Sequence, residues 1–234
     1  LSYRMQFAGW TTLYLPDLVV PAEIPDTIAA FKSQQFRWAK GSTQTAVKLW
    51  GELWRQPVSV FKKLQAVFHM THYFVHPLML TLALLALPVL LTLKLSLAPL
   101  LFGLLALALG VSIIGPNALY FTSQLSAYES GWRRVLWMPC LVMVGVGLAV
   151  SNTRAVGEAL LGVESGFIRT PKRGERQLKR YRPAFSPLAL VEVGIGLWCA
   201  AGFGVYLAAG KYLVGPFLAV DTAGYLFVGI LTLI

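Results

Sequence analysis

The stretch that decides the fold is MTHYFVHPLMLTLALLALPVLLTL, residues 70–93, which contains no Asp, Glu, Lys or Arg. A helix crosses the hydrocarbon core of a bilayer with about 20 mainly apolar residues, so this stretch predicts a membrane span. A second run without these charged residues covers 95–128, directly after Lys94. The two runs together predict a hairpin of membrane helices, roughly 72–93 and 98–120.

The composition of the whole chain also favours a membrane protein. Of its 234 residues, 56% are hydrophobic and 13% are charged, and the mean hydropathy is +0.64. An average soluble domain has about 25% charged residues, so the composition argues against such a domain and excludes a disordered chain. The only cysteines, Cys140 and Cys199, lie in apolar runs, which excludes a secreted disulfide scaffold.

Two further spans are expected near the end of the chain. Residues 187–234 contain only three charged residues, Glu192, Lys211 and Asp221, and the two helices should separate near Gly210. The two acids within these spans are either hydrogen-bond partners for a substrate or groups close enough to the interface to be paired.

The charge distribution predicts how the chain is oriented in the membrane. Residues 1–68 carry eight Lys or Arg against four acids, and residues 169–182 carry seven against one. Positive charge collects on the cytoplasmic side, so both segments are expected there. A charge-poor run, 135–153, would place 169–182 outside if it crossed the membrane. We therefore expect this run to lie at the interface or to re-enter, with a span as the alternative.

The amino-terminal segment precedes the first predicted span and is more polar. Residues 1–9 predict the end of a helix near Gly9, and 11–25 predict a short strand, as at the end of an α/β domain; a juxtamembrane loop is the alternative. Asp26 is expected to cap a helix over 27–50, followed by a short basic helix over 57–68. Basic helices bearing aromatic residues suit a membrane surface.

One patch on the helix expected over 27–50 has the chemistry of a sugar-nucleotide site. Gln34, Arg37 and Trp38 are spaced three and four residues apart, so they share one helix face. Guanidinium and amide groups suit phosphate oxygens, and a flat indole suits a sugar ring. The alternative is an interfacial Trp with a snorkelling Arg beside lipid headgroups, and spacing alone favours it. His69, His72 and His76 have the spacing of a metal or proton site, although hydrogen-bonded interface histidines are the favoured interpretation.

Three motifs extend this interpretation. The string QQFRWAKG (34–41) resembles the Q-x-x-R-W motif of processive family 2 glycosyltransferases, the cellulose-synthase-like membrane enzymes. LSYR (1–4) and the following GW…YLPD pattern are similar to family sequences after the catalytic acidic motif. FIRTPK (167–172) resembles the F-x-V-T-x-K gating loop, with Arg169 at the Val position.

This resemblance implies a membrane-embedded hexosyltransferase. Such enzymes transfer sugar from a donor such as UDP-glucose or GDP-mannose to a growing β-linked polysaccharide, of cellulose, mannan or glucomannan type. Gln34, Gln35, Arg37 and Trp38 would bind donor and acceptor. The loop residues implied by the resemblance, which would close over the nucleotide, are Phe167, Thr170 and Lys172.

The catalytic acids of the family are not found in this sequence. The family's Mg²⁺ or Mn²⁺ ligands and general base lie in acidic motifs, which we expect before Leu1, so we expect no catalytic residue and no metal ligand here. We expect the chain to be a piece of a longer protein and to be inactive alone. The alternatives are a lipid-acceptor glycosyltransferase of the same family and a non-enzymatic transporter or channel subunit. Nucleic-acid binding is not expected, because the basic residues border membrane segments.

The expected fold is mainly α: about four membrane spans with interfacial amphipathic helices, and a short remnant of a cytosolic α/β glycosyltransferase domain, in a multi-pass protein of the cell (inner or plasma) membrane. The partners are the lipid bilayer, the nucleotide sugar and the polysaccharide. The expected divisions are the end of the cytosolic domain (1–25), interfacial helices with Q-x-x-R-W (26–68), two spans (69–122), an interfacial helix with the gating-loop-like segment (123–182) and two spans (183–234).

Overall fold

The computed structural model describes residues 2–15, 17–92, 99–166, 186–210 and 215–233. Within these ranges the chain forms helices, joined by links without regular structure, and no strand. It divides into two compact units. The first unit comprises Leu1–Val75 with Ser151–Ala184, and the second comprises His76–Val150 with Phe185–Ile234.

The longest helix of the first unit is α2 (Ile28–Arg55). Its cap is Thr27, whose Oγ1 accepts a hydrogen bond from the Ala30 amide at 3.2 Å. The prediction of Asp26 as the cap was therefore wrong by one residue, because the helix begins at Ile28 and its cap is the residue directly before it. The helix stops before Pro57, because a residue preceding proline is driven out of the helical region and Gln56 is extended.

The helix α3 (Val60–Thr71) follows and continues into a short 3₁₀ turn, η1 (His72–Phe74). Ser59 caps α3 through its Oγ, which accepts from the Lys62 amide at 3.4 Å. The side chain of Ser42 on α2 donates to the Met70 carbonyl at 3.0 Å. Apolar side chains from both helices form the core between them: Ala46, Leu49, Leu53, Ala66 and Met70.

The segment before α2 differs from the expectation. Helix α1 (Ser2–Phe7) ends as predicted at Gly9, whose φ of +86° is a conformation that glycine adopts without strain. The strand predicted within 11–25 is wrong, since the described residues of that segment have no regular structure. A strand is stabilised by pairing with a neighbour, and the described chain offers none. The alternative prediction of a loop agrees with this backbone, although the exposed Leu13 and Tyr14 explain why the pattern suggested a strand.

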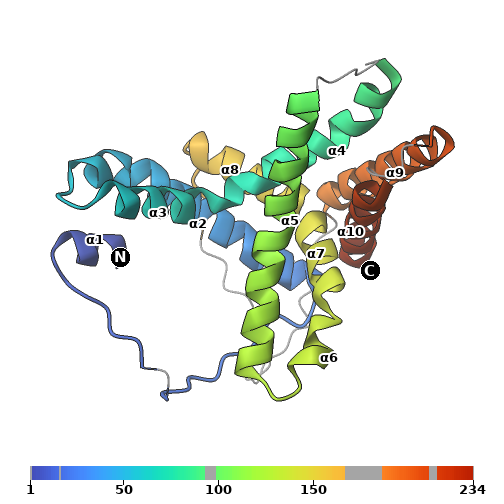
Figure 1. Ribbon diagram of the computed structural model, residues 1–234. Helices are drawn as coiled ribbons and strands as arrows, with labels where there is room; N and C mark the ends of the chain where they lie inside the picture. Colours follow the sequence, from blue (N-terminus) through green and yellow to red (C-terminus); the bar gives the residue numbers. More distant parts are fainter. Residues whose placement is uncertain (1, 16, 93–98, 167–185, 211–214, 234) are drawn as a thin grey trace. The chain divides into compact units, whose positions relative to one another are not determined.

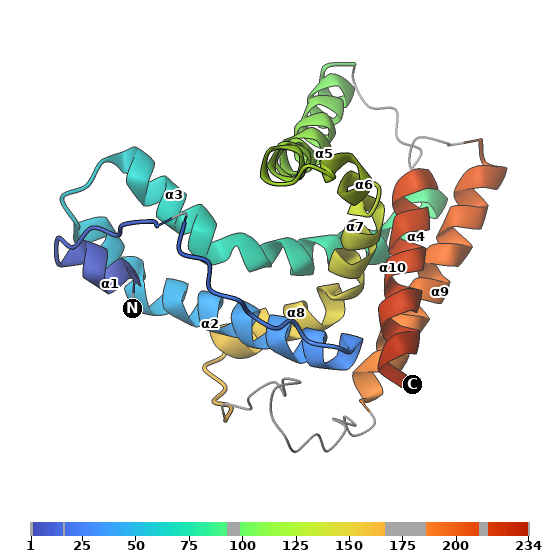
Figure 2. The ribbon, with the colours of Figure 1, turned by 90° about the horizontal axis from the view of Figure 1, so that it is seen from below.

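The second unit contains the apolar helices, drawn in green, yellow, orange and red in Figure 1. They are α4 (Val75–Thr92), α5 (Pro99–Ala127), α6 (Gly131–Val135), α7 (Met138–Gly147), α9 (Pro187–Ala208) and α10 (Gly215–Leu233). Helices α9 and α10 lie side by side in both Figure 1 and Figure 2. The predicted break between them is confirmed near Gly210, which has a φ of +69°.

The membrane character of the fold is confirmed. In the described part of the chain, three helical stretches are long and apolar enough to span a bilayer: Val60–Val89, Pro187–Ala208 and Gly215–Leu233. A bent pair, Gly131–Gly147 with Ala149–Leu160, passes the same test only when taken together. The protein is thus mainly α-helical and multi-pass.

The run 135–153 does not form one straight helix. Helix α7 ends at Gly147 and α8 (Ala149–Leu160) begins two residues later, with a bend of 46° between them. A bend of this size suits a re-entrant segment or a broken span equally. The expectation that this run does not cross the membrane therefore stays a prediction.

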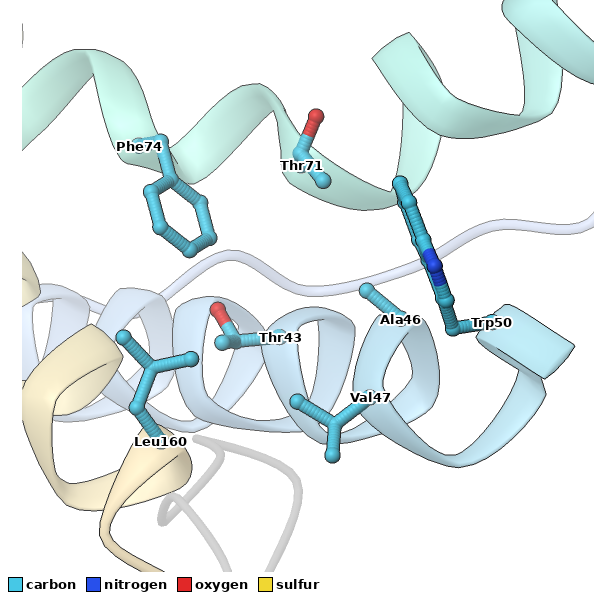
Figure 3. A pocket seen from close by; sticks show the side chains of 7 residues that line it. All are labelled: Thr43, Ala46, Val47, Trp50, Thr71, Phe74 and Leu160. Carbon is cyan, nitrogen blue, oxygen red and sulfur yellow. The ribbon is translucent and has the colours of Figure 1, made fainter.

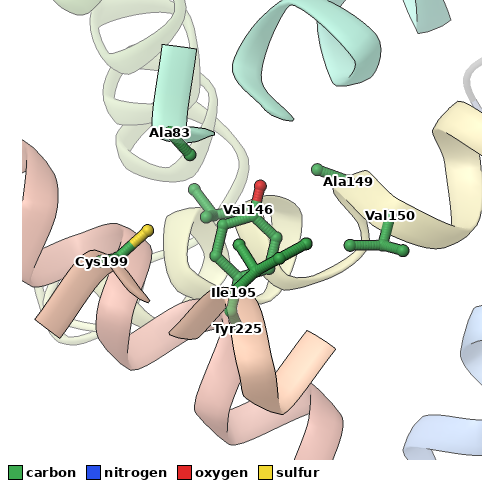
Figure 4. Packing of buried hydrophobic residues seen from close by; sticks show 7 residues of the cluster. All are labelled: Ala83, Val146, Ala149, Val150, Ile195, Cys199 and Tyr225. Atoms are coloured by element: carbon green, nitrogen blue, oxygen red, sulfur yellow. The ribbon is translucent and has the colours of Figure 1, made fainter. Parts of the chain in front are cut away.

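Helices α7, α9 and α10 approach closely where glycines remove the side chains. A Cβ at Gly147 would collide with the Gly224 carbonyl and with Val228, and a Cβ at Gly224 would lie 2.5 Å from the Met143 carbonyl oxygen. Small residues at helix crossings allow this approach in membranes, where packing replaces the hydrophobic effect as the main attraction. Figure 4 shows Tyr225 and Val146 within the adjoining core.

Hydrogen bonds attach α9 to α4 in the same unit. The Tyr206 hydroxyl donates to the Ala86 carbonyl at 2.9 Å, and Trp198 Nε1 donates to the Leu84 carbonyl at 3.3 Å. Both acceptors lie in the turn before Pro88, whose ring lacks an N–H and so leaves the Leu84 carbonyl without its usual helical donor. The Trp198 bond therefore supplies a donor to the one carbonyl of α4 that Pro88 leaves without one.

Candidate functional site

The candidate site lies on α2, in the first unit. Trp38 is 54% exposed, while Ala39 and Lys40 beside it are buried. Successive helical residues are rotated by about 100°, so Lys40 lies on the face opposite Trp38. Ala39 packs with Tyr73 of η1 and with α8, which leaves the Trp38 indole free of the core.

The other predicted binding residues of this helix are less exposed than Trp38. Gln34, Gln35 and Arg37 are half-buried. Gln35 Oε1 accepts a long hydrogen bond, 3.5 Å, from the Tyr73 hydroxyl, so it faces the core of the unit more than the exposed patch. The structure thus places an exposed indole beside a partly covered guanidinium.

Lys40 forms an ion pair that the sequence did not reveal. Its ammonium donates to Glu158 Oε2 on α8 at 2.8 Å and to Ser165 Oγ at 3.0 Å. The Lys40 side chain is 5% exposed and that of Glu158 is 17% exposed. Arg154 Nε donates to the other carboxylate oxygen at 2.8 Å. A buried ammonium requires such partners, because its desolvation is costly when it is unpaired.

The electrostatics of this pair favour the charged carboxylate. The hydrogen bond from Lys40 lowers the pKa of Glu158 below its ordinary value, burial opposes this, and Arg154 adds to the lowering. The ion pair fixes α8 against the face of α2 opposite Trp38. It therefore orients α2, the motif helix that carries Q-x-x-R-W, without covering the exposed surface around Trp38.

Lys40 and Glu158 were not predicted as partners. The spacing of Arg154 and Glu158, four residues apart, was a visible signal for an ion pair on one helix. The contact with Lys40 was not visible, because the two residues are separated by 118 positions. Only the packing of α8 on α2 brings them together.

Phe167, Thr170 and Lys172, the three loop residues implied by the resemblance, lie outside the described residues. The described chain before them ends at Gly166, one residue after Ser165. Their role therefore stays a prediction.

The histidines singled out in the sequence have other partners. His69 Nδ1 lies 2.6 Å from the Tyr3 hydroxyl, and His72 Nδ1 lies 2.7 Å from the His69 carbonyl oxygen. Across the described ranges, no group of three His, Cys, Asp or Glu side chains is arranged to hold a metal ion. The contact of His69 with Tyr3 connects α1 with the end of α3, as an interface residue does.

Loss of the Glu158 charge should destabilise the first unit. Glu158→Gln leaves the buried Lys40 ammonium without its counterion, and breaking a buried pair in this way costs about 3–5 kcal/mol. We expect Glu158→Gln to have a lower thermal unfolding midpoint in detergent than Lys40→Met, because in Lys40→Met the Glu158 carboxylate still pairs with Arg154. Lys48→Met, at an exposed lysine of the same helix, should change the midpoint little.

The same pair predicts a pH dependence. A carboxyl with a lowered pKa in the folded state stabilises the protein above the pKa of the unfolded chain, and this stabilisation is lost as the pH falls through the folded value. The wild-type midpoint should therefore drop more steeply between about pH 5 and pH 3 than that of Glu158→Gln. Equal slopes for the two proteins would contradict the assigned ion pair.

Curated proteins that resemble part of this chain are plant mannosyltransferases. Glucomannan 4-beta-mannosyltransferase 1 of Oryza sativa subsp. japonica is 34% identical over 70 residues, 30% of this chain and 13% of its own length. Glucomannan 4-beta-mannosyltransferase 2 of Arabidopsis thaliana is 38% identical over 69 residues, 29% of this chain and 13% of its own. Glucomannan 4-beta-mannosyltransferase 7 of Arabidopsis thaliana is 39% identical over 64 residues, 27% of this chain and 12% of its own.

These matches cover under a third of this chain, and the chain spans only 12–13% of the length of the relatives it matches. No family model matches the chain, and no solved structure matches it at a significant level. The similarity therefore links the chain to glycosyltransferases over less than a third of its length.

Proposed function

We propose that this chain is part of a membrane-bound family 2 glycosyltransferase that extends a β-linked polysaccharide of mannan, glucomannan or cellulose type. The observation that carries the proposal is the similarity to glucomannan mannosyltransferases, in a chain whose Q-x-x-R-W helix exposes its tryptophan. The apolar helices of the second unit support a membrane location.

In this proposal Trp38 binds the terminal sugar of the acceptor. A flat indole contacts the C–H face of a pyranose ring over a large apolar area. The exposure of Trp38 supports this role, because an indole buried in the core has no surface to offer. The ion pair of Lys40 with Glu158 lies on the opposite face of α2, so it fixes the helix and leaves the indole exposed.

In this proposal Gln34 and Arg37 bind the donor, and Gln35, whose amide oxygen faces Tyr73, contributes only the NH₂ of its amide to the donor or acceptor. A guanidinium binds phosphate oxygens with two parallel hydrogen bonds, and an amide adds donors to hydroxyl or phosphate groups. Positive charge near the leaving diphosphate stabilises the charge that develops there during transfer. Phe167, Thr170 and Lys172 complete the donor site in this proposal.

In this proposal the general base and the divalent ion act in the catalytic step of the whole enzyme. The described residues offer no site that fits the Mg²⁺ or Mn²⁺ ion implied by the resemblance. The proposal assigns no ligand of that ion to the described residues. Its residues bind and orient the sugars.

The proposed topology places the motif helix and residues 169–182 in the cytoplasm of a cell (inner or plasma) membrane. The positive charge of both segments supports this side. A nucleotide sugar is then available to the motif helix, and the apolar helices provide the path for the polysaccharide.

The experiment that tests the function uses the full-length protein in membrane vesicles. Radiolabelled GDP-mannose and, separately, UDP-glucose are supplied, and the label is measured in polymer and in organic extracts. We expect polymer label from one of the two donors. Label confined to the organic extract would show a lipid acceptor instead, and no label from either donor with folded protein would contradict the proposed activity.

A further inference from the structure

The first unit contains an apolar pocket between its amino-terminal helices and the end of α8. Its volume is about 360 Å³, a size in the range of small-ligand pockets. Figure 3 shows its lining side chains, which come from α2, from the α3–η1 junction and from the end of α8. They are Thr43, Ala46, Val47, Trp50, Thr71, Phe74 and Leu160.

The two hydroxyls of the lining are already used. Thr43 Oγ1 donates to the Ala39 carbonyl at 2.9 Å, and Thr71 Oγ1 donates to the Val67 carbonyl at 2.8 Å. Each hydroxyl has one hydrogen to donate, so neither is available as a donor to an occupant. The pocket therefore offers mainly methyl, methylene and aromatic surface, which does not suit a sugar or a nucleotide.

The aromatic end of the pocket leads to positive charge. Trp50 contacts Trp54 edge to face, with ring centroids 5.9 Å apart. The Lys63 ammonium lies 5.9 Å from the Trp54 ring and donates to the Trp54 carbonyl at 2.9 Å. Lys62, next to it, is exposed. Membrane proteins contact the acyl chains with apolar side chains, the interface with tryptophan and the headgroups with lysine, in the same order.

The charge of the surrounding helices adds to this arrangement. Residues 28–71 contain seven Lys or Arg and a single acid, Glu52. Exposed apolar side chains, including Phe61 and Phe68, continue along α3. A basic surface with exposed aromatics binds membranes that contain anionic lipids more strongly than neutral ones.

We propose that this pocket binds one acyl chain of an anionic phospholipid, whose phosphate contacts Lys62 and Lys63. The acyl chain occupies the space among Val47, Phe74 and Leu160. The bound lipid would fill the gap between α2, η1 and α8 and so stabilise the unit that carries Trp38. This proposal does not depend on which sugar the protein transfers.

The test uses photolabelling of the full-length protein in two kinds of vesicle. One contains phosphatidylglycerol with a diazirine in its acyl chain, and the other contains phosphatidylcholine with the same acyl chain. After irradiation, labelled peptides are identified by mass spectrometry. We expect label on the peptides that line the pocket, at least several-fold higher with phosphatidylglycerol.

Two matched substitutions identify the site. Val47→Trp fills the pocket and should abolish its label, whereas Val60→Trp, at an exposed valine outside the lining, should leave it unchanged. Lys62→Gln combined with Lys63→Gln should equalise the labelling by the two lipids. Thermal unfolding of each variant shows whether it is folded, and the double lysine variant tests the headgroup contact without altering the pocket lining.

Four results would overturn the proposal. The label could be spread evenly over all lipid-facing helices, or persist on the lining peptides of folded Val47→Trp. Equal labelling of the wild type by both lipids would remove the anionic headgroup from the proposal. Absence of lipid label at the pocket, with cross-linking of its residues to another protein segment, would show that protein covers it.

Discussion

Replacing Trp38 with alanine in the full-length protein should reduce polymer synthesis by about two orders of magnitude, the effect of losing the orientation of a reacting group. The expected reason is that the acceptor sugar loses the surface on which it stacks. Because Trp38 is 54% exposed and its neighbour Ala39 makes the core contacts, the substitution should hardly change the thermal unfolding midpoint. Label incorporated per folded protein measures the effect.

Two controls separate this role from general damage. Trp137→Ala removes an indole that is 71% exposed outside the proposed site, and should leave synthesis near the wild-type rate. Trp38→Phe keeps a flat aromatic surface and should retain part of the activity. Synthesis by Trp38→Ala at the wild-type rate would show that the exposed indole is an interfacial residue only.

Adding a single methyl group at Gly147 should have the second large effect, on stability. The new Cβ in Gly147→Ala collides with the Gly224 carbonyl and with Val228, so α7 and α10 must separate. Overpacking of this kind costs about 1–3 kcal/mol. The thermal unfolding midpoint in detergent should fall, and polymer synthesis should fall with it.

The matched control lies two residues earlier in the same helix. A Cβ at Gly145 would have no heavy atom within 4 Å, so Gly145→Ala adds a methyl group without a collision. Alanine is favoured over glycine within a helix by about 1 kcal/mol, so this variant should unfold at the same or a higher temperature. Equal destabilisation by both substitutions would contradict the close crossing of α7 and α10.

Much of the helical fold could be predicted, because membrane helices are specified by local composition. The apolar runs predicted α4, α9 and α10 within a few residues, and Gly210 marked the break between the last two. The bend between α7 and α8 was not predicted. The close contact of Gly147 with α10 was not predicted either, because no local pattern contains it.

The strand predicted near the amino terminus shows where a local pattern fails. Alternating apolar residues in 11–25 suggested a strand, but a strand also needs a partner, and the described chain has none. Local pattern therefore predicted a preference that the surrounding structure did not satisfy.

The candidate site was partly predictable. Helical spacing alone placed Trp38 and Arg37 on one turn, and the structure adds that the indole is exposed. Lys40, two residues away, had no assigned role, because its partners Glu158 and Ser165 come from the other end of the first unit's sequence. Contacts of such long sequence separation require the folded structure.

The most direct test of the proposed function is digestion of the labelled product made by the full-length protein. The product from the active donor is treated separately with an endo-β-1,4-mannanase and an endo-β-1,4-glucanase. We expect a polymer that one of the two enzymes converts to short oligosaccharides, and that the Trp38→Ala protein does not make. A product resistant to both enzymes, or no product from folded wild-type protein, would contradict a β-linked polysaccharide synthase of the mannan, glucomannan or cellulose type.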